Sequence, residues 1–551
     1  MVDTPTIWKP QHQANTDDIG NQEDPIAIDI GMGRYVVVWE DDTFGPSPGN
    51  DLVGQIFDAR GDLIGSQFQV NQGFSSDSET DASLASRPGG GFVMVYEDTD
   101  GSGTSIRAET YDVNGVRITT GVPTVIAPDP GAPTISNPEI AMRPDGSFLV
   151  TYQMSNGAGD TDIVGRIVNT SGVAGGQFTI FSQIDDSTDP DAAALTNGNY
   201  IVVYEDEFAA STTDIDVKFT IVNPTTGAVV TSGTVASSIS LEDDPHVAAL
   251  TGGGFVVTYQ DDDGDGASNP GIKARVFDNN GVALGAAFTV NTTATGSQNE
   301  PDITALADGG FVVVWDDDDA GVLRGQRYDA AGAKVGTEFL AGSIDQETDP
   351  TAALLGDGRF IIPFKEATGD DDVYATIFDP RTGPIDGTSG ADILTSRKEG
   401  AAMNGLGGKD ILLGDDGVDI IKGGGGKDMI SGGLAKNKMW GNGGKDWFVF
   451  DTELGAGNKG IIKDFKTKKE KIFLDEDIFD TIGGKLGKKE FVEGKKAKDG
   501  NDHIIYKNGK LYYDEDGKGG DGKVLFAKLK GKPDDLTHKN FIVDDFSELF
   551  L

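Results

Sequence analysis

The chain has 551 residues, no cysteine, four histidines and a net charge of −45 at pH 7. Without cysteine it can form no disulfide and hold no cysteine-ligated zinc. A negative field of this strength repels nucleic acids and anionic lipid surfaces and favours cations as partners. We expect no membrane span, because no apolar run is long enough, and no Sec-type signal peptide, because the first residues lack a basic and then apolar leader.

Charge and a long repeat both mark residues 1–386 as one part of the chain. This part holds 61 acidic against 17 basic residues, whereas residues 387–551 hold 29 against 28. Variants of Asp-Pro-x-x-Ala-x-Leu-x-x-Gly-Gly-Phe-Val-Val-Val-Trp-Glu-Asp recur seven times in it. We place the proline or its equivalent at Pro25, Asp81, Pro138, Pro190, Pro245, Pro301 and Pro350. The spacings, from 49 (301 to 350) to 57 (81 to 138), are typical of propeller blades.

Each unit predicts four short strands. In the sixth unit a small-apolar strand at 302–306 leads through a tight turn into a β-branched strand at 311–315, and a third strand follows at 326–329. Unit seven lacks a clear fourth strand, while residues 12–16 precede Pro25 much as residues 288–292 precede Pro301. We therefore predict an all-β chain in which residues 1–386 form a seven-bladed β-propeller, closed by the N-terminal strand.

An aromatic residue closes the second strand of every unit, and packing between blades is favoured over ligand stacking as its role. These residues are Trp39, Tyr96, Tyr152, Tyr204, Tyr259, Trp315 and Phe364. The long loops of all blades should emerge on one face, and they carry acidic runs that predict either a recognition face or a solvated rim. The runs are 40–42, 97–100, 205–207, 261–265, 316–319 and 370–372, with 185–186 and 243–244 between blades.

One of these acidic loops has the spacing of a calcium loop. Residues 261–266 read Asp-Asp-Asp-Gly-Asp-Gly, in which alternate carboxylates can fold around calcium while glycine permits the bend. We therefore predict Asp261, Asp263 and Asp265 as calcium ligands, with a solvated acidic loop as the alternative.

Residues 387–450 contain nine-residue repeats that start at 387, 396, 405, 414, 423, 432 and 441. Position eight is always apolar, which predicts one buried residue on a short strand per repeat and a parallel roll with two repeats per coil. The fifth copy, Gly-Gly-Gly-Gly-Lys-Asp-Met-Ile-Ser, fits the pattern G-G-x-G-x-D-x-U-x at every position. The chain here resembles the RTX (hemolysin-type) proteins, in which this nonapeptide binds calcium.

Glycines let each turn bend so that carbonyl and carboxylate oxygens face an ion. Odd copies should stack on one side of the roll and even copies on the other. The predicted calcium ligands are Asp392, Asp410, Asp428 and Asp446 on the odd side, Asp419 on the even side, and the turn residues Gly405, Gly407, Gly423, Gly425, Gly441 and Gly443. We expect about three ions on the odd side, one in each gap between its turns.

The even side departs from the pattern, because position six there reads Ala401, Asp419 and Asn437. Copies two and six also carry cations at positions around the turn. Our hypothesis is that these cations partly replace calcium; they are Arg397, Lys398, Lys436 and Lys438.

Residues 451–551 predict a β-rich cap of short apolar strands. Asp514 and Asp516 in this part are a further candidate calcium pair, with a plain hairpin loop as the alternative. The RTX resemblance implies export by a type I secretion apparatus through an uncleaved C-terminal signal, for which the candidate is residues 544–551. It therefore implies a secreted, extracellular or cell-surface location, and the calcium-poor cytosol would leave the roll unfolded until export.

The common hydrolase motifs are absent or misplaced. No His-Glu-x-x-His occurs, and the Gly-x-Ser-x-Gly match at 45–49 holds two prolines in an acidic loop, which cannot form a nucleophile elbow. Paired carboxylates for glycoside chemistry stay open. The leading interpretation is a calcium-loaded binding or adhesion protein for a glycan or a surface partner. The alternatives are an extracellular polysaccharide-active enzyme and a self-assembling matrix component.

Overall fold

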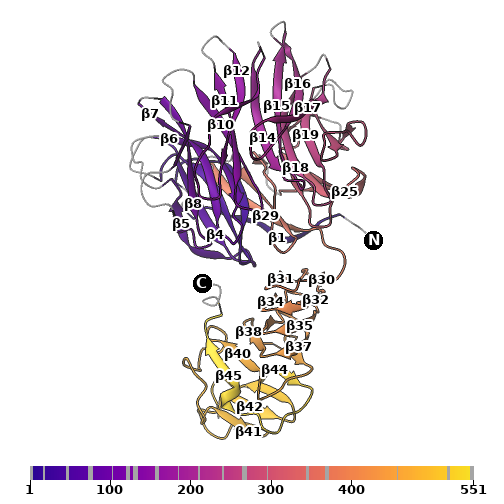
Figure 1. The fold of residues 1–551 in the computed structure, drawn as a ribbon. Coiled ribbons are helices and arrows are strands. Elements are labelled where there is room, and N and C mark those ends of the chain that lie inside the picture. Colours follow the sequence, from indigo (N-terminus) through magenta and orange to yellow (C-terminus); the bar gives the residue numbers. More distant parts are fainter. Residues whose placement is uncertain are drawn as a thin grey trace. The chain divides into compact units, whose positions relative to one another are not determined.

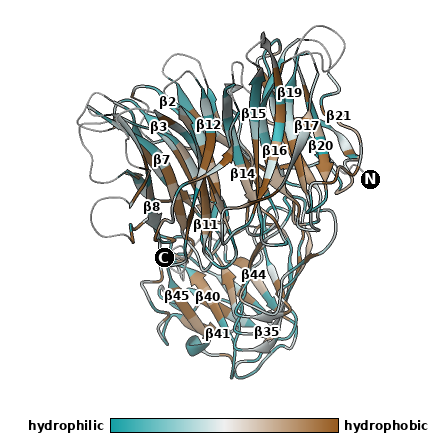
Figure 2. Ribbon diagram, turned by 45° about the horizontal axis from the view of Figure 1, so that its top comes forward, coloured by the Kyte–Doolittle hydropathy of each residue, from teal (hydrophilic) through white to brown (hydrophobic). Residues whose placement is uncertain are grey.

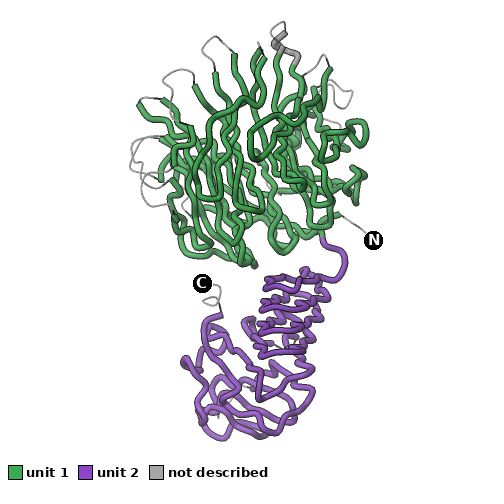
Figure 3. Tube along the Cα trace, viewed as in Figure 1, with its two compact units in different colours: residues 1–380 green, residues 381–551 purple. Residues whose placement is uncertain are grey.

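The computed structural model describes residues 4–16, 19–44, 49–71, 78–101, 103–118, 124–127, 134–155, 160–183, 185–208, 211–238, 241–262, 270–293, 296–342, 347–366, 371–455, 457–517 and 522–546. The described part is built of strands, with a single turn of 3-10 helix, η1 (His538–Asn540) (Figure 1). No helix within it is long and apolar enough to cross a membrane. The chain divides into two compact units, residues 1–380 and 381–551 (Figure 3).

The first unit is a seven-bladed propeller of antiparallel sheets. The first three blades are β2 (Gln22–Gly31), β3 (Arg34–Asp41), β4 (Asp51–Phe57), β5 (Leu63–Gln69); β6 (Ser78–Ser86), β7 (Phe92–Asp100), β8 (Gly103–Tyr111), β9 (Thr124–Ala127); and β10 (Ile135–Met142), β11 (Phe148–Ser155), β12 (Thr161–Val168), β13 (Phe178–Phe181). The next three are β14 (Ser187–Ala194), β15 (Tyr200–Phe208), β16 (Ser211–Val222), β17 (Val229–Ala236); β18 (Glu242–Ala249), β19 (Phe255–Asp261), β20 (Gly271–Phe277), β21 (Phe288–Thr289); and β22 (Gln298–Ala305), β23 (Phe311–Asp317), β24 (Val322–Tyr328), β25 (Lys334–Leu340).

The seventh blade joins the two ends of the propeller. Its strands β26 (Glu347–Thr348), β27 (Ala353–Leu354), β28 (Phe360–Glu366) and β29 (Asp372–Asp379) are completed by β1 (Thr6–Gln13), which pairs antiparallel with β29. The pairing runs from Thr6 opposite Asp379 to Gln13 opposite Tyr374. The N-terminal strand is thus the outer strand of blade seven, and the edge of β29 is not left open.

The propeller core lies between blades. All seven aromatic residues that end the second strands are at most 2 % exposed, which confirms that they pack in the core. A second aromatic layer stacks the start of strand two on the end of strand three, as in Phe255 with Phe277, whose ring centroids are 4.9 Å apart. Hydrophobic residues accordingly follow the strands (Figure 2). Repetition of one packing unit is what lets a sequence period of about 55 residues specify a ring.

The second unit is a coil of two parallel sheets that runs into a mixed cap. One sheet is ordered β30 (Ile385–Asp386), β32 (Ala402–Asn404), β35 (Ile420–Gly426), β37 (Lys438–Gly444), β39 (Gly460–Ile462), β44 (Val524–Leu529), β43 (Lys510–Tyr513), β42 (Ile504–Lys507) and β41 (Phe491–Glu493), with β33 (Gly407–Gly408) beside β35. The other is β31 (Ile393–Thr395), β34 (Ile411–Leu413), β36 (Met429–Ser431), β38 (Trp447–Phe450), β40 (Lys471–Asp475) and β45 (Phe541–Asp544).

The register of these sheets places two nonapeptides in each coil. Position-eight residues pair with each other across neighbouring strands, Leu394 with Leu412 and then Ile430 with Phe448. One buried core extends from Ile385 to Val543, so the coil and the C-terminal strands share it. The second unit begins slightly before the predicted boundary at 387, because β30 already pairs with the coil strand β32.

We predict that the closing strand contributes strongly to propeller stability. Trp8 is 7 % exposed, and the Arg359 guanidinium carbon lies 3.8 Å from its ring centroid. Trp8→Ala should therefore lower the free energy of propeller unfolding by about 3 kcal/mol in chemical denaturation. Ile7→Ala, in the same strand but at a 49 % exposed position, is the matched control and should change it by less than about 0.5 kcal/mol. Equal effects of the two variants would contradict this role.

Candidate functional sites

The innermost strand of each blade bends at one residue in the left-handed backbone region. These seven residues have φ between 45° and 53° and are Asp24, Asp81, Asn137, Asp189, Asp244, Glu300 and Asp349. In six blades the bend shows as a register shift against the second strand, as between Glu23 and Ile26. A left-handed residue other than glycine costs of order 1–3 kcal/mol and persists only where its surroundings hold it. The recurrence of such a residue at seven equivalent positions therefore indicates that the bend is a regular part of every blade.

Alignment on these residues corrects one assignment from the sequence. The left-handed residue precedes a proline in six blades, but in blade two it is Asp81 itself, and Ala82 stands in the place of the proline. The prediction that Asp81 is the proline equivalent was wrong by one position. Proline was the marker in the other units, and its absence here hid the register.

Glutamates from the preceding blade hold the bends in place. The backbone N–H of Asp81 donates to Glu40 Oε1 at 2.8 Å, and that of Asp244 donates to Glu205 Oε1 at 2.8 Å. Asn137 N–H donates in the same way to Glu97 Oε1 at 2.6 Å. Each of these bonds joins two neighbouring blades at the channel.

The same glutamates were expected in long exposed loops, as part of either a recognition face or a solvated rim. They lie instead in the second strands, and Glu40, Glu97 and Glu205 are between 5 % and 7 % exposed. Asp316, at the corresponding end of β23, is 2 % exposed, and burial, followed by the charge of Glu300, raises its pKa to about 8. Glu40, Glu97, Glu205 and Asp316 are therefore structural residues at the ends of the second strands. The sequence prediction ended these strands too early and so placed the four residues in loops.

A second ring of polar residues lies two positions further along the inner strands. Blades three to six contribute Glu139, Asp191, His246 and Asp302. His246 Nε2 lies 3.4 Å from Asp244 Oδ1, while its Nδ1 lies 3.6 Å from Asp302 Oδ1 and 3.8 Å from Asp191 Oδ2. One imidazole thus contacts carboxylates from three blades.

Backbone and hydroxyl donors hold these carboxylates from the neighbouring blade. Val247 N–H donates to Asp191 Oδ2 at 2.7 Å, and Ala352 N–H donates to Asp302 Oδ2 at 2.6 Å. Ser83 Oγ donates to Glu139 Oε2 at 2.6 Å. The acids are consequently fixed in orientation before any ligand arrives, as a binding or catalytic site requires.

Burial and mutual charge separate the protonation states of the ring. Burial, followed by the charge of Asp191, raises the pKa of Glu139 to about 8. Burial raises the pKa of Asp191 to about 6, although the nearby His246 opposes the shift. Burial lowers the pKa of His246, but its hydrogen bond with Asp244 and the neighbouring carboxylates outweigh this and raise it to about 10. At neutral pH the ring therefore holds a protonated acid, a carboxylate and an imidazolium side by side.

Both rings line a cavity of about 410 Å³ in the channel. Its walls carry nine acidic side chains, Asp24, Asp81, Glu139, Asp189, Asp191, Asp244, Glu300, Asp302 and Asp349, together with Asn137 and His246. Because the bends lie near the start of the innermost strand, the cavity is at the end of the channel where the second strands finish and the long loops leave. Cavities of this size commonly accept small ligands.

Sequence reasoning missed this site. None of the channel residues was predicted from the sequence as a site residue, and paired carboxylates were left open without assignment. The signal was present in the column two positions after the bend, which reads Ile26, Ser83, Glu139, Asp191, His246, Asp302 and Thr351. A run of four ionisable residues in consecutive units, in a strand otherwise of small apolar residues, would have marked it.

The predicted propeller calcium loop is only partly described. Asp263 and Asp265 lie outside the described residues, so that this loop stays a prediction. Asp261 ends β19, is 5 % exposed, and forms an ion pair with Lys273 Nζ at 2.6 Å. In the cap, burial and the neighbouring Asp516 raise the pKa of Asp514. Calcium binding by Asp514 and Asp516 stays a prediction.

The aspartates of the coil stack at 18-residue intervals. Asp392 N–H donates to Asp410 Oδ1 at 3.0 Å, and Asp428 N–H donates to Asp446 Oδ1 at 3.2 Å. The other oxygen, Oδ2, is buried and has no hydrogen-bond partner among the described residues in Asp410, Asp419, Asp428 and Asp446. Buried carboxylate oxygens without a partner are costly, and burial accordingly raises the pKa of Asp410, Asp419 and Asp428 to about 6. A proton, a donor or a cation could each satisfy these oxygens.

Backbone oxygens converge on the same places. A β-carbon added to Gly387 would lie 2.6 Å from Asp392 Oδ2 and 3.0 Å from the carbonyl oxygen of Gly405 in the next coil. At Gly405 it would likewise meet Asp410 Oδ2 and the Gly423 carbonyl oxygen. Among the residues described, no group of three His, Cys, Asp or Glu is spaced to hold a metal by side chains alone. A cation here would therefore take one carboxylate per turn and backbone carbonyls, which is a ligand set that calcium accepts.

The cations of the even side do not fill its turns. Arg397 donates to the carbonyl oxygen of Gly383 at 2.6 Å, and Lys398, Lys436 and Lys438 are exposed. The hypothesis that these charges replace calcium is not supported by where they lie. In β37 Met439 is buried, so its neighbour Lys438 points outward.

Comparisons with known proteins assign the chain to no family. No family model matches it, and no curated protein matches it. Among solved structures it is similar to a protein of unknown function from Dyadobacter fermentans (12 % identity, 68 % of this chain and 98 % of that one, TM-score 0.41), to the α-L-arabinanase of Penicillium chrysogenum (11 %, 68 % and 99 %, 0.43) and to the polysaccharide lyase Uly1 (11 %, 68 % and 100 %, 0.45). The function has to be sought in this chain's own residues.

We predict that the channel makes the propeller less stable as the pH rises. The ordinary pKa of Glu139 is 4.5 and its folded value is about 8, so between these values the folded state binds more protons than the unfolded state. The stability from this group is therefore present below about pH 4.5 and is lost as the pH approaches 8. In thermal unfolding from pH 5 to 8, Glu139→Gln should give a flatter pH dependence than the natural protein.

Glu338→Gln is the matched control for this titration. Burial raises the pKa of Glu338, but hydrogen bonds from Thr292 and Thr293 and the charge of Arg324 outweigh it, and the pKa is lowered. Since Glu338 stays ionised between pH 5 and 8, its variant should shift stability by the same amount across that range. If Glu139→Gln did the same, the titration of Glu139 would not contribute.

Proposed function

We propose that this chain is a secreted, calcium-dependent protein that binds a glycan in the channel of its propeller. The observation that supports the proposal most is the 410 Å³ cavity with its fixed ring of acids around His246. Carboxylates accept hydrogen bonds from sugar hydroxyl groups, while a protonated Glu139 and the His246 imidazolium can donate to ring and hydroxyl oxygens. A polyhydroxylated ligand uses donors and acceptors together, which is what the two rings offer.

The binding test is a glycan array probed with the full chain, in calcium and in chelator. We expect binding to one sugar class, and a loss of at least about tenfold in affinity for Asp191→Asn and Asp302→Asn, because each removes a charged acceptor. Asp145→Asn is the matched control, since Asp145 has a half-exposed side chain in the β10–β11 turn, remote from the inner-strand bends. Binding that survives both channel variants would place the ligand elsewhere.

A second candidate function is cleavage of an extracellular polysaccharide. The observation that favours it is the pKa difference between Glu139, at about 8, and Asp191, at about 6, on neighbouring blades of one cavity. Glycoside hydrolysis needs one protonated and one ionised carboxyl group across the scissile bond. In that case the natural protein would cleave the glycan found on the array, and new reducing ends would form at neutral pH. The Glu139→Gln variant should form none.

For the second unit we propose that calcium binds in the aspartate turns. The residues present fit the ion, because the turns of Asp410, Asp419, Asp428 and Asp446 each offer a buried Asp oxygen with no hydrogen-bond partner among the described residues. Backbone carbonyl oxygens lie beside it, as at Gly405 and Gly414. In the first turn, Asp392 Oδ2 already accepts from the backbone N–H of Thr388 at 2.6 Å. When bound, calcium would supply the positive charge that these oxygens lack. Where calcium is scarce, the stacked Asp carboxylates would repel one another. The coil would therefore fold after export, in keeping with the RTX resemblance and a type I secretion route.

Calcium should therefore raise the melting temperature of the second unit. A ligand that binds only the folded state at 100 times its dissociation constant stabilises it by about 2.7 kcal/mol. We expect a rise of several degrees on moving the full chain from chelator to millimolar calcium, monitored by tryptophan fluorescence, to which Trp440 and Trp447 of the coil contribute. Asp410→Ala should reduce the rise, whereas Asp477→Ala, outside the stack, should not. An unchanged melting temperature in calcium would exclude the site.

A further inference from the structure

One turn of the coil carries Asn437 where its stacked neighbour carries Asp419. The two side chains are oriented alike, because Asp419 N–H donates to Asn437 Oδ1 at 2.8 Å, just as Asp410 N–H donates to Asp428 Oδ1 at 3.2 Å. Asn437 is 1 % exposed. The amide is therefore an isosteric replacement for the aspartate, held in the same place by the same backbone bond.

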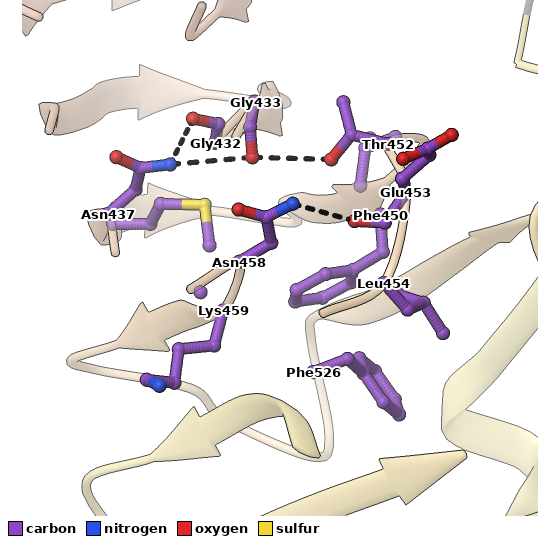
Figure 4. A pocket seen from close by; sticks show the side chains of 13 residues that line it. Gly432, Gly433, Asn437, Phe450, Thr452, Glu453, Leu454, Asn458, Lys459 and Phe526 are labelled. Atoms are coloured by element: carbon purple, nitrogen blue, oxygen red, sulfur yellow. Dashed lines mark hydrogen bonds between the residues drawn. The ribbon is translucent and has the colours of Figure 1, made fainter. Parts of the chain in front are cut away.

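The difference lies in the second terminal atom. In Asp428 it is Oδ2, which is buried without a hydrogen-bond partner among the described residues. In Asn437 it is Nδ2, which donates to the carbonyl oxygen of Gly432 and, at 3.5 Å, to that of Gly433 (Figure 4). It also donates to the carbonyl oxygen of Leu434. These carbonyls are the first three of the repeat. The Asn437 Nδ2 group thus occupies the position that Oδ2 takes in an aspartate turn, and it donates to carbonyl oxygens there.

The rest of this turn is also satisfied by protein groups. Thr452 Oγ1 donates to the Gly433 carbonyl oxygen at 3.3 Å (Figure 4). Ala435 N–H donates to Asn458 Oδ1 at 3.0 Å. The cavity beside it measures only about 20 Å³. Both bonds come from the segment after the coil, so the turn is closed by its own amide and by the cap.

We propose that the Asn437 amide takes the place of a calcium ion, so that turn 432–437 closes without metal while the aspartate turns require it. The proposal rests on the calcium binding proposed above for the aspartate turns. Its physical basis is that carbonyl oxygens gathered around one point need positive charge there, and an N–H pair supplies it as a cation would. The turn of the sixth nonapeptide would therefore be independent of metal, with the Asn437 amide in the place of the ion and the bonds to Thr452 and Asn458 completing it.

Exchanging the two residue types should move calcium sites in opposite directions. The number of calcium ions bound per full-length chain is measured by equilibrium dialysis and atomic absorption for the natural protein, Asn437→Asp and Asp428→Asn. We expect one ion more for Asn437→Asp, which restores an unpartnered oxygen, and at least one fewer for Asp428→Asn, which closes its turn. Sites elsewhere in the chain cancel in these differences.

The outcomes separate this inference from the function on which it rests. If the natural protein binds calcium but Asn437→Asp binds the same number of ions, Asn437 does not replace an ion and the inference is overturned. If Asn437→Asp fails to fold, the Asp428→Asn count decides, and an unchanged count there overturns the inference as well. If instead Asp410→Ala, Asp428→Asn and the natural protein all bind the same number, calcium does not occupy the aspartate turns, and the proposed function of the second unit is wrong.

A readout without metal gives an independent check. In chelator, Asp428→Asn should melt at a higher temperature than the natural protein, because an unpartnered buried oxygen gains hydrogen bonds. Asn437→Asp should melt lower under the same conditions, because it loses them. Shifts of the same sign in both variants would overturn the proposal.

Discussion

The propeller depends on seven backbone bends that are unfavourable by themselves. Each innermost strand takes one residue into the left-handed region, at a cost of order 1–3 kcal/mol, and turns its neighbouring side chains toward the channel. Hydrogen bonds from these bends to Glu40, Glu97 and Glu205 of the preceding blades offset that cost. The bends therefore link the blades into a ring and at the same time build the wall of the cavity.

Both units bury carboxylate or carbonyl oxygens that carry negative charge. In the channel this charge is reduced by protonation, because burial raises the pKa of Glu139 to about 8, and it is balanced by the His246 imidazolium among the carboxylates. Among the described residues no such cation lies inside the turns of the coil, and Asp410 Oδ2 has no hydrogen-bond partner there. At Asn437 a side-chain N–H donor of the chain itself satisfies the carbonyl oxygens of the turn. A chain with a net charge of −45 is thus specified as much by how it neutralises buried oxygen as by its apolar core.

The sequence predicted what is periodic and missed what is local. The period of about 55 residues predicted seven blades, and the apolar eighth position of each nonapeptide predicted the buried residues Leu412, Ile430 and Phe448. A bend such as that at Asp81 breaks the two-residue period of a strand, so pattern reading placed it one residue off. The direction of a side chain is equally invisible, and this is why charge was expected to matter at Lys436 when the amide of Asn437 makes the contacts.

The channel site forms only when the ring closes. Glu139, Asp191 and His246 are separated by more than 50 residues in sequence, and nothing local ties them together. Closure places them in one cavity, where their mutual charges set their protonation states. The pKa difference that lets such a cavity both donate to and accept from a sugar is also the difference that glycoside cleavage requires. The two functions proposed for this cavity, binding and cleavage, would therefore use the same electrostatics, and they would differ in whether the two carboxyl groups can stand on opposite sides of a glycosidic bond with room for water.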